Sequence, residues 1–325
     1  MKRKIRRIME TCCLVLLCAG LTMSGGCEWP DLSPASVASA LSRQVTVSDS
    51  WDAAGSQTHD GRLTAVFLDV GQADAALLTL PNGRHMLIDG GNNNDGTLIC
   101  DYLQEQGIDT IDYLIATHPH EDHIGGLDTV IEELEIGSIY APRLADDDIP
   151  TTRTYEDFLE AISDKGYKLH GAKAGDYLLK EEDVAVQVLS PADESYEELN
   201  NYSVVLRITY GRTSMLLAGD AETLCEEEML DEGYELQSDL LKVGHHGSHS
   251  SSSADFIEAV APSYAVISCG EDNTYGHPHA ETLETLEAAG AQVFRTDMQG
   301  TILAVSDGQT LTLSADQSIC CDGGR

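Results

Sequence analysis

The most constraining feature of this chain is a dense group of ligand-type side chains. His118, His120, Asp122 and His123 fall within six residues, directly after the apolar run Tyr113–Ala116. A loop at the end of a strand can aim alternate side chains into one cleft, and imidazole and carboxylate groups are ligands that zinc, manganese and iron accept. Chance rarely concentrates so many of them in one loop. The stretch therefore predicts a metal centre at the end of a buried strand.

Three further predicted strands also end in ligand-type residues. Asp89 closes one of them in Leu87–Gly91, Asp220 closes another, and the pair His245-His246 follows a third. Taken singly, Asp89 would indicate an ordinary turn, Asp220 the start of a loop or a helix cap, and the His pair a solvated loop. Beside the first group they predict a site for two divalent ions, because four groups of ligands at strand ends can converge on one cleft.

The predicted elements alternate in two similar halves. Three β runs come first, at 63–69, 75–80 and 84–88, and they favour an antiparallel sheet. The first half continues with helices at 98–106, 126–134 and 152–166 and strands at 113–116 and 138–141. The second half has strands at 184–189, 240–243 and 265–268, hairpins at 203–218 and 301–313, and helices at 222–230, 254–260 and 280–289. This order predicts an α/β (α+β) fold of four layers, αββα, with two sheets face to face in one domain at 62–314.

The first residues predict export. Five positive charges crowd the first seven residues, and a short apolar run, Leu14–Leu21, follows them. This pattern is typical of a signal peptide, here 1–26, and the run is too short to span a bilayer. Ser24-Gly25-Gly26 before Cys27 resembles a lipoprotein cleavage site with Cys27 lipidated, and plain secretion is the alternative. We expect a surface lipoprotein or a secreted protein, with a flexible tether at 27–61 and a polar tail at 315–325.

The charge of the chain is strongly negative. Asp and Glu number 55 against 19 Lys and Arg, a formal net charge of −36. Removal of residues 1–26 takes away five positive charges and one negative, which gives about −40. Such a surface is expected to have no positively charged patch that would bind a nucleic-acid backbone. The nine cysteines form no CxxC pair, so neither a disulfide framework nor a zinc ribbon is expected.

The motifs together resemble the metallo-β-lactamase superfamily and, more narrowly, the extracellular hydrolase domain of the ComEC competence protein and its free-standing relatives. The matching segments are 67–74, 87–91, 116–126, 200–205, 216–222, 241–248 and 275–279. The resemblance covers 63–313 and implies the four-layer sandwich of the metallo-β-lactamase type. It also implies metal-dependent hydrolysis, and a ComEC-like domain is associated with DNA processing.

Roles at the site follow from the resemblance. His118 and His120 would hold the first of two divalent ions, Zn²⁺ or Mn²⁺. Asp122 and His123 would hold the second, with His245 preferred over His246 as their partner, and Asp220 would bridge the two ions. The catalytic groups would be Asp122, His246 and His279. Residues expected behind the ligands or against the substrate are Asp69, Gln72, Asp74, Asp89, Asn200, Asn201, Ser203 and Ser248.

Two departures from the superfamily pattern stand out. Many members carry a further His on a middle strand, where this chain has Asn200-Asn201-Tyr202-Ser203, a pattern that the ComEC-like branch shares. Neutral Asn is a poorer ligand, so the first ion would be held more weakly or would be an oxygen-preferring ion such as Mn²⁺. His170 is an alternative ligand from another segment. The family's Gly-Gln-Gly-Asp is Gly71-Gln72-Ala73-Asp74 here, which requires a negative φ at Ala73.

The predicted function is that of an exported metal-dependent hydrolase, a phosphodiesterase or nuclease that uses a metal-activated water. The substrate is expected to be a small phosphodiester or a nucleic acid, and the negative charge argues against tight DNA binding. Hydrolysis of another ester, a lactone or a β-lactam is one alternative, which the missing His disfavours. A non-catalytic metal-binding surface module is another, which the intact cluster disfavours. No protein partner is implied, and membrane contact would come only through the N-terminal lipid.

Overall fold

The computed structural model describes residues 61–316. The predicted signal peptide, the lipidation site Cys27 and nearly all of the predicted tether lie outside these residues. Of the predicted polar tail, Ala315 and Asp316 are described, and both belong to the last strand. No helix in the described part is long and apolar enough to cross a membrane.

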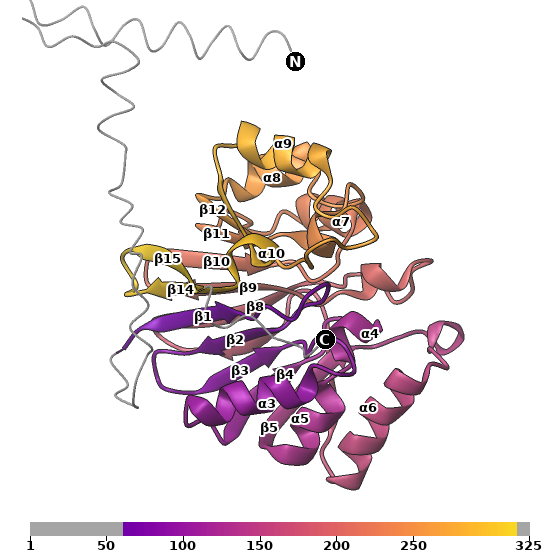
Figure 1. Ribbon diagram of the computed structural model, residues 1–325. Coiled ribbons are helices and arrows are strands. Elements are labelled where there is room, and N and C mark those ends of the chain that lie inside the picture. Colours follow the sequence, from indigo (N-terminus) through magenta and orange to yellow (C-terminus); the bar gives the residue numbers. More distant parts are fainter. Residues whose placement is uncertain (1–60, 317–325) are drawn as a thin grey trace, which may run out of the picture. The chain divides into compact units, whose positions relative to one another are not determined.

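Two β-sheets pack face to face, with helices on both outer sides (Figure 1). The first sheet has the order β15-β14-β1-β2-β3-β4-β5-β6, and the second has the order β13-β12-β11-β10-β9-β8-β7. The strands of the first sheet are β1 (Leu63–Phe67), β2 (Ala76–Thr79), β3 (His85–Ile88), β4 (Thr110–Ile115), β5 (Glu135–Pro142), β6 (Leu169–Ala172), β14 (Thr301–Ser306) and β15 (Leu311–Asp316). Those of the second are β7 (Tyr177–Lys180), β8 (Val184–Ser190), β9 (Val205–Tyr210), β10 (Thr213–Leu217), β11 (Leu240–Lys242), β12 (Tyr264–Ile267) and β13 (Gln292–Arg295).

The helices divide between the two outer faces. Those before β6 pack on the first sheet and those after β10 pack on the second, except for the short α10 between β13 and β14 (Figure 1). They are α3 (Gly96–Glu105), α4 (Glu121–Ile124), α5 (Leu127–Glu133), α6 (Arg153–Asp164), α7 (Thr223–Asp231), α8 (Ala254–Val260), α9 (Ala280–Ala288) and α10 (Thr296–Gln299). Single 3₁₀ turns are η1 (Asp146–Asp148) and η2 (Leu199–Tyr202), and a tight left-handed turn, η3 (Gly244–Gly247), follows β11. The predicted αββα sandwich is confirmed.

Three apolar cores separate the four layers. The central core lies between the sheets and includes Phe67, Val186 and Met215, all at most 1 % exposed. A second core joins the first sheet to α3, α5 and α6, and a third joins the second sheet to α7, α8 and α9. Because a strand buried on both faces must be apolar throughout, the sequence of β12 is a continuous apolar run, whereas β4 is continuously apolar and buried only at its carboxyl end, at Leu114 and Ile115.

The predicted strands and helices recur within a few residues of their expected ends, including the antiparallel start β1-β2-β3. Three strands, β6, β7 and β13, were not predicted. Each lies at an edge of its sheet, where half of the backbone groups face away from any neighbour and few apolar side chains are needed. The second predicted hairpin, β14–β15, returns to the first sheet and pairs with β1.

Parallel strand pairs determine where the site lies. β3, β4 and β5 are parallel in the first sheet, and β10, β11 and β12 are parallel in the second. In parallel arrangements the carboxyl ends of neighbouring strands share one edge, where ligands bind in open α/β sheets. The loops after these strands carry the predicted ligands, so both sheets present them at one end of the sandwich.

Candidate metal centre

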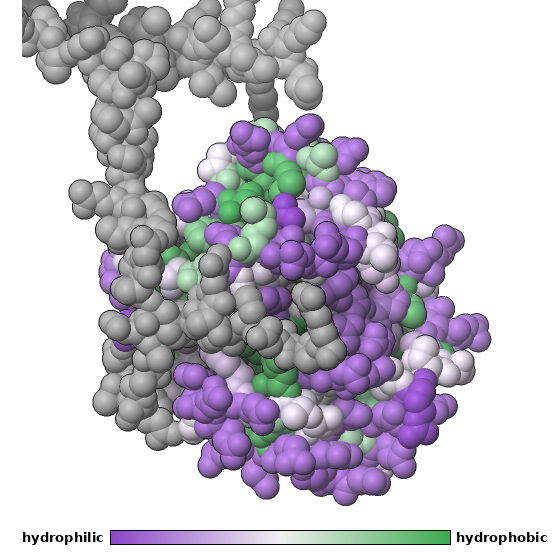
Figure 2. All heavy atoms as spheres, in the orientation of Figure 1, coloured by the Kyte–Doolittle hydropathy of each residue, from purple (hydrophilic) through white to green (hydrophobic). Residues whose placement is uncertain are grey.

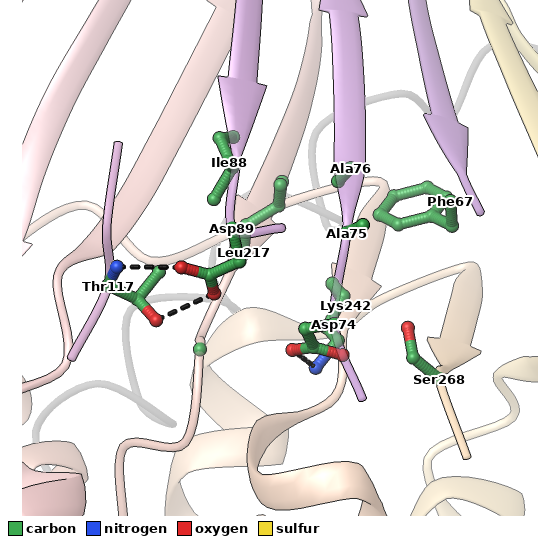
Figure 3. A pocket seen from close by; sticks show the side chains of 11 residues that line it. Phe67, Asp74, Ala75, Ala76, Ile88, Asp89, Thr117, Leu217, Lys242 and Ser268 are labelled. Carbon is green, nitrogen blue, oxygen red and sulfur yellow. Dashed lines mark hydrogen bonds and ion pairs between the residues drawn. The ribbon is translucent and has the colours of Figure 1, made fainter. Parts of the chain in front are cut away.

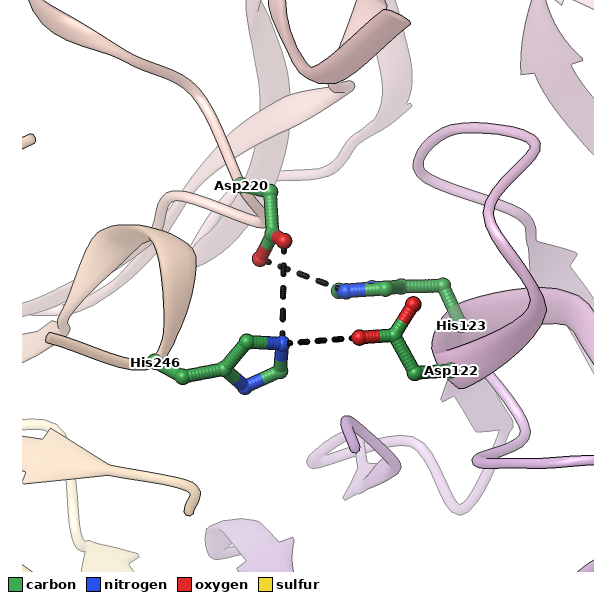
Figure 4. Close-up of side chains that lie close together, drawn as sticks. All are labelled: Asp122, His123, Asp220 and His246. Carbon is green, nitrogen blue, oxygen red and sulfur yellow. Dashed lines mark ion pairs between the residues drawn. The ribbon is translucent and has the colours of Figure 1, made fainter. Parts of the chain in front are cut away.

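Four side chains from both halves of the chain converge at this end (Figure 4). Asp122 and His123 lie in the short helix α4 that follows β4, Asp220 follows β10 and His246 follows β11. One ligand-type atom from each lies within 4.8 Å of all the others. His123 Nε2 is 3.2 Å from Asp220 Oδ1, and His246 Nε2 is 3.3 Å from Asp122 Oδ2 and 3.6 Å from Asp220 Oδ2. We call these four residues the Asp122–His246 cluster.

The cluster fits a divalent cation. Among the described residues, His123 Nε2, His246 Nε2 and Asp220 Oδ1 are buried and make no hydrogen bond. Buried polar atoms without partners cost free energy, and native proteins rarely leave several at one point. Two imidazole nitrogens and carboxylate oxygens that face one another are the donor set of zinc and manganese sites. A cation would satisfy all of these atoms at once.

Asp89 contacts His123 from behind. Its Oδ2 is 2.7 Å from His123 Nδ1, and its two oxygens accept hydrogen bonds from the backbone N–H and the hydroxyl of Thr117, at 2.8 and 2.7 Å. A carboxylate on Nδ1 places the proton there and leaves Nε2 as the free ligand atom. Asp89 itself has a φ of 62°, so the chain turns sharply at the end of β3. The structure thus places the Asp89 carboxylate against His123, and its orienting role stays a prediction.

A second group of side chains also lies near the carboxylate of Asp220. His118 Nε2 and His245 Nε2 are each 3.9 Å from Asp220 Oδ2, and His118 Nε2 is 3.0 Å from His120 Nδ1. Asn200 Nδ2 lies 3.5 Å from His245 Nε2. The Asp220 carboxylate therefore lies close to side chains of both groups, and its bridging of two ions stays a prediction. His170 lies elsewhere, exposed on β6 with its ring 5.4 Å from that of Tyr140.

The positions of His245 and His246 differ from the sequence-based expectation. His246 is 2 % exposed and belongs to the Asp122–His246 cluster, whereas His245 is partly exposed and lies on the side of His118 and Asn200. The structure thus places His246, and not His245, beside Asp122 and His123. Both residues have left-handed backbones, with φ of 49° and 52°, so that consecutive side chains point to different groups. Such conformations are strained for non-glycine residues and occur at functional sites.

In the cluster, burial and the charges of neighbouring side chains shift the pKa values in opposite directions. Burial disfavours the charged form of His123, but the carboxylates of Asp220 and Asp89 outweigh it and raise the pKa of His123 well above its usual value. Burial disfavours the carboxylate of Asp220, and His123 and His246 outweigh that effect and lower its pKa. For His118, burial and the neighbouring His123 outweigh the carboxylate of Asp220 and hold its pKa well below the usual value. His118 is therefore neutral and available as a ligand.

A buried ion pair lies behind the cluster, and sequence reasoning missed one of its members. Lys242, 4 % exposed on β11, donates to Asp74 Oδ2. The pair lines a cavity of about 20 Å³ between the sheets, together with Asp89, Thr117 and Ser268 (Figure 3). Asp74 Oδ1 is also 3.6 Å from His246 Nδ1. Because Lys242 sits within an apolar strand, its sequence context gave no signal of this role.

The remaining predicted residues have varied positions. Ser203 Oγ accepts a hydrogen bond from the Asp220 backbone N–H at 3.0 Å, and Asn201 faces Glu222 and Cys225 rather than the cluster. Ser248 bonds Ser250 within its own loop. Asp69 accepts from Gly71 N–H, and its own N–H donates to Thr301 at the start of β14, away from the ligands. Gly71 has a φ of 71°, whereas Ala73 is not among the positive-φ residues, as its side chain requires.

Two histidines near the opening were also missed. His277 lies beside His245 and His246, and His249 packs on His279 with ring centroids 4.6 Å apart. His279 Nδ1 accepts a hydrogen bond from the His249 backbone N–H at 3.0 Å, and its ring contacts that of His277. His279, the residue expected to face the substrate, therefore lies one ring further from the cluster than His277.

The fold and this donor set define the class of the protein. The metallo-β-lactamase superfamily model matches residues 68–271, and the chain belongs to this superfamily. The chain is 32 % identical over 256 residues to ComE operon protein 3 of Bacillus subtilis, and this match covers 72 % of the chain and 32 % of that protein. It is 32 % identical over 237 residues to Competence protein ComA of Neisseria gonorrhoeae, covering 72 % and 31 %. The chain thus spans about a third of the length of these relatives.

A solved structure of similar fold is CmlA, a diiron β-hydroxylase from Streptomyces venezuelae. The two chains are 14 % identical with a TM-score of 0.49, over 74 % of this chain and 53 % of that one. The superfamily membership predicted from the motifs is confirmed, and so is the similarity to competence proteins.

Proposed function

We propose that the protein is an exported phosphodiesterase that hydrolyses its substrate with two divalent ions, Zn²⁺ or Mn²⁺. The observation that carries this proposal is that Asp220, a member of the Asp122–His246 cluster, also lies 3.9 Å from His118 and from His245 of the second group. When bound at such a site, divalent ions supply an activated water and polarise a phosphoryl oxygen.

The protein's own residues define what each group does. Asp122, His123, Asp220 and His246 would hold one ion, and His118, His120, Asp220 and His245 the other, with Asn200 beside them. Asp89 holds His123 in the tautomer that leaves Nε2 free, and Ser203 fixes the backbone of Asp220. His245 replaces the middle-strand His of other superfamily members in this proposal. The ion beside His118 would be the more weakly held, because neutral Asn200 stands beside that group and is a poorer ligand than imidazole.

The substrate class follows from charge and similarity. The relatives with competence functions favour a nucleic acid, whereas the net charge of −36 opposes tight binding of a polyanion. A short or small phosphodiester has the same bond as a nucleic acid but carries too few charges to be strongly repelled. Export, either as a lipoprotein anchored through Cys27 or as a secreted protein, is part of the proposal and is supported by the basic and then apolar N-terminus.

The test is hydrolysis of bis(p-nitrophenyl) phosphate by the metal-free protein after addition of Mn²⁺ or Zn²⁺. We expect metal-dependent cleavage by the wild-type protein and a loss of at least about 10³-fold in the Asp220→Asn variant, which removes the shared carboxylate charge. The His170→Asn variant, changed on β6 outside the site, serves as the control and should retain full activity. The proposal fails if the metal-loaded wild-type protein leaves this ester intact while it opens the β-lactam nitrocefin.

A further inference from the structure

His277 stands at the opening of the candidate metal centre, and its surroundings differ from those of the metal-ligand candidates. Its ring centroid is 5.6 Å from that of His245 and 6.3 Å from that of His246. The ring is partly exposed, and Tyr275, which is 67 % exposed, stacks on it at 5.6 Å. A molecule that enters from solvent therefore meets His277 before it reaches the buried His246.

The loop that carries His277 is fixed against the turn that carries His245 and His246. A Cβ at Gly247 would lie 2.6 Å from Pro278 Cβ, so only glycine permits this contact. His279 N–H donates to Gly247 O at 2.9 Å. Asn273 Oδ1 accepts from His277 N–H at 3.0 Å, and Asn273 Nδ2 donates to His277 O at 2.6 Å. These contacts hold the His277 backbone in one place relative to the site.

Gln72 determines which ring nitrogen of His277 carries the proton. Gly270 N–H donates to Gln72 Oε1 at 3.0 Å, so the oxygen of this amide must face Gly270. The amide nitrogen then faces the other way, and Gln72 Nε2 lies 3.4 Å from His277 Nδ1. An amide N–H can only donate, so Nδ1 must be the acceptor and the ring proton must be on Nε2. A Cβ at Gly270 would lie 2.8 Å from Gln72 N, which shows how closely the two loops approach.

We propose that His277 donates its Nε2–H to a phosphoryl oxygen of the substrate, and that Gln72 is the positioning residue that keeps this tautomer; this inference rests on the proposed phosphodiester hydrolysis. No described residue accepts a hydrogen bond from His277 Nε2, and the partly exposed ring leaves it open to an incoming ligand. Both the neutral tautomer set by Gln72 and the imidazolium carry this N–H. A preorganised donor aimed at an oxygen that gains negative charge stabilises the transition state.

Two substitutions separate the donor role from a structural role. In His277→Gln, the longer amide can place its N–H where imidazole Nε2 was. In His277→Asn, the amide reaches only the position of Nδ1, so it can keep the contact to Gln72 but cannot donate to the substrate. We expect kcat/KM on bis(p-nitrophenyl) phosphate to fall about 10²–10³-fold in His277→Asn and to stay within about tenfold of wild type in His277→Gln. His170→Asn is the matched control.

A second measurement does not depend on turnover. ¹⁵N NMR of the Zn²⁺-loaded protein should show the His277 ring proton on Nε2, and this proton should move to a mixture of both nitrogens in Gln72→Leu. Inorganic phosphate added to the wild-type protein should shift the Nε2 resonance, because phosphate presents the same oxygens as the substrate.

The outcomes are distinct. Equal activity losses in His277→Asn and His277→Gln at unchanged metal content contradict the donor role, and so does a wild-type proton on Nδ1. If the wild-type protein cleaves no phosphodiester, the proposed function fails, and the phosphate titration decides the role of His277 by itself. A shifted Nε2 resonance then supports the contact, and an unmoved one overturns it.

Discussion

At the scale of single residues, adjacent histidines acquire different surroundings from the backbone alone. Because His245 and His246 both have left-handed φ values, one side chain points to the buried cluster and the other to the side of Asn200. From the sequence the pair is recognisable, but nothing in a Gly-His-His-Gly string specifies φ, so the expected partner of Asp122 was His245, whereas the structure places His246 beside it. The ligand-type residues at the ends of β3, β4 and β10 could be predicted because their position after an apolar run determines where they point.

The different placements of the two histidines predict different metal losses. We expect His246→Ala to lose the more tightly bound ion, because it removes one of two buried imidazoles from the Asp122–His246 cluster. His245→Ala should retain that ion and lose only the weaker one. Metal content after dialysis measures both, with circular dichroism as the check on folding. Equal losses in the two variants would contradict the assignment.

The two buried cysteine thiols should react slowly with alkylating reagents. Burial raises the pKa of Cys225 and of Cys269 to about 12, so at pH 8 only about 10⁻⁴ of either thiol is thiolate, the reactive form. Both are free cysteines in the described part of the chain. Alkylation of the native protein at pH 8, followed by peptide mass mapping, should leave these two cysteines unmodified until denaturant is added. Native labelling at the denatured rate would show that they are accessible.

At the scale of elements, glycines allow the segments beneath the site to approach one another closely. A Cβ at Gly126, the first residue before α5, would lie 2.4 Å from Gly90 O and 2.6 Å from Gly96 N. The loop after β3 and the start of α3 thus meet the start of α5 backbone to backbone. The Asp89-Gly90-Gly91 turn could be predicted from sequence, whereas the contact to Gly126 could not, because it depends on tertiary packing. The edge strands β6, β7 and β13 escaped prediction for a related reason, since their pairing is set by a neighbour rather than by their own apolar pattern.

This packing predicts a large effect of one methyl group. Gly126→Ala should lower the free energy of unfolding by about 1–3 kcal/mol, because a clash with backbone cannot be relieved by a rotamer change. Gly171→Ala on β6 is the control, since its Cβ would meet nothing closer than 4.0 Å. Urea denaturation of both variants measures the difference. A Gly126→Ala variant as stable as Gly171→Ala would contradict the described contact.

At the scale of the whole molecule, the site lies where the two halves of the chain meet. Asp74, Asp89 and the His118–His123 loop come from the first half, and Asp220, Lys242 and His246 come from the second. The Lys242–Asp74 ion pair crosses the same junction. The predicted order of elements was enough to give two sheets with helices outside, and the motifs gave the superfamily. The sequence could not show that β14 and β15 join the first sheet, since a hairpin pattern does not indicate which other strand the hairpin pairs with.

A cation shared by the two halves should stabilise their packing. At free metal concentrations of 100–1,000 times Kd, binding adds roughly 3–4 kcal/mol to the free energy of unfolding. For a domain of this size that raises the thermal midpoint by about 6–16 °C relative to protein treated with a chelator. In Asp220→Asn the difference should largely disappear. A thermal midpoint that is the same with metal and with chelator would argue against a cation at the junction.

The central claim is that a divalent ion binds between the two halves of the chain at the Asp122–His246 cluster. Anomalous X-ray diffraction from crystals grown with Mn²⁺ tests it most directly. We expect an anomalous peak within bonding distance of His123 Nε2, His246 Nε2 and a carboxylate oxygen of Asp220. Full Mn²⁺ occupancy elsewhere on the protein, with no peak among these atoms, would contradict it.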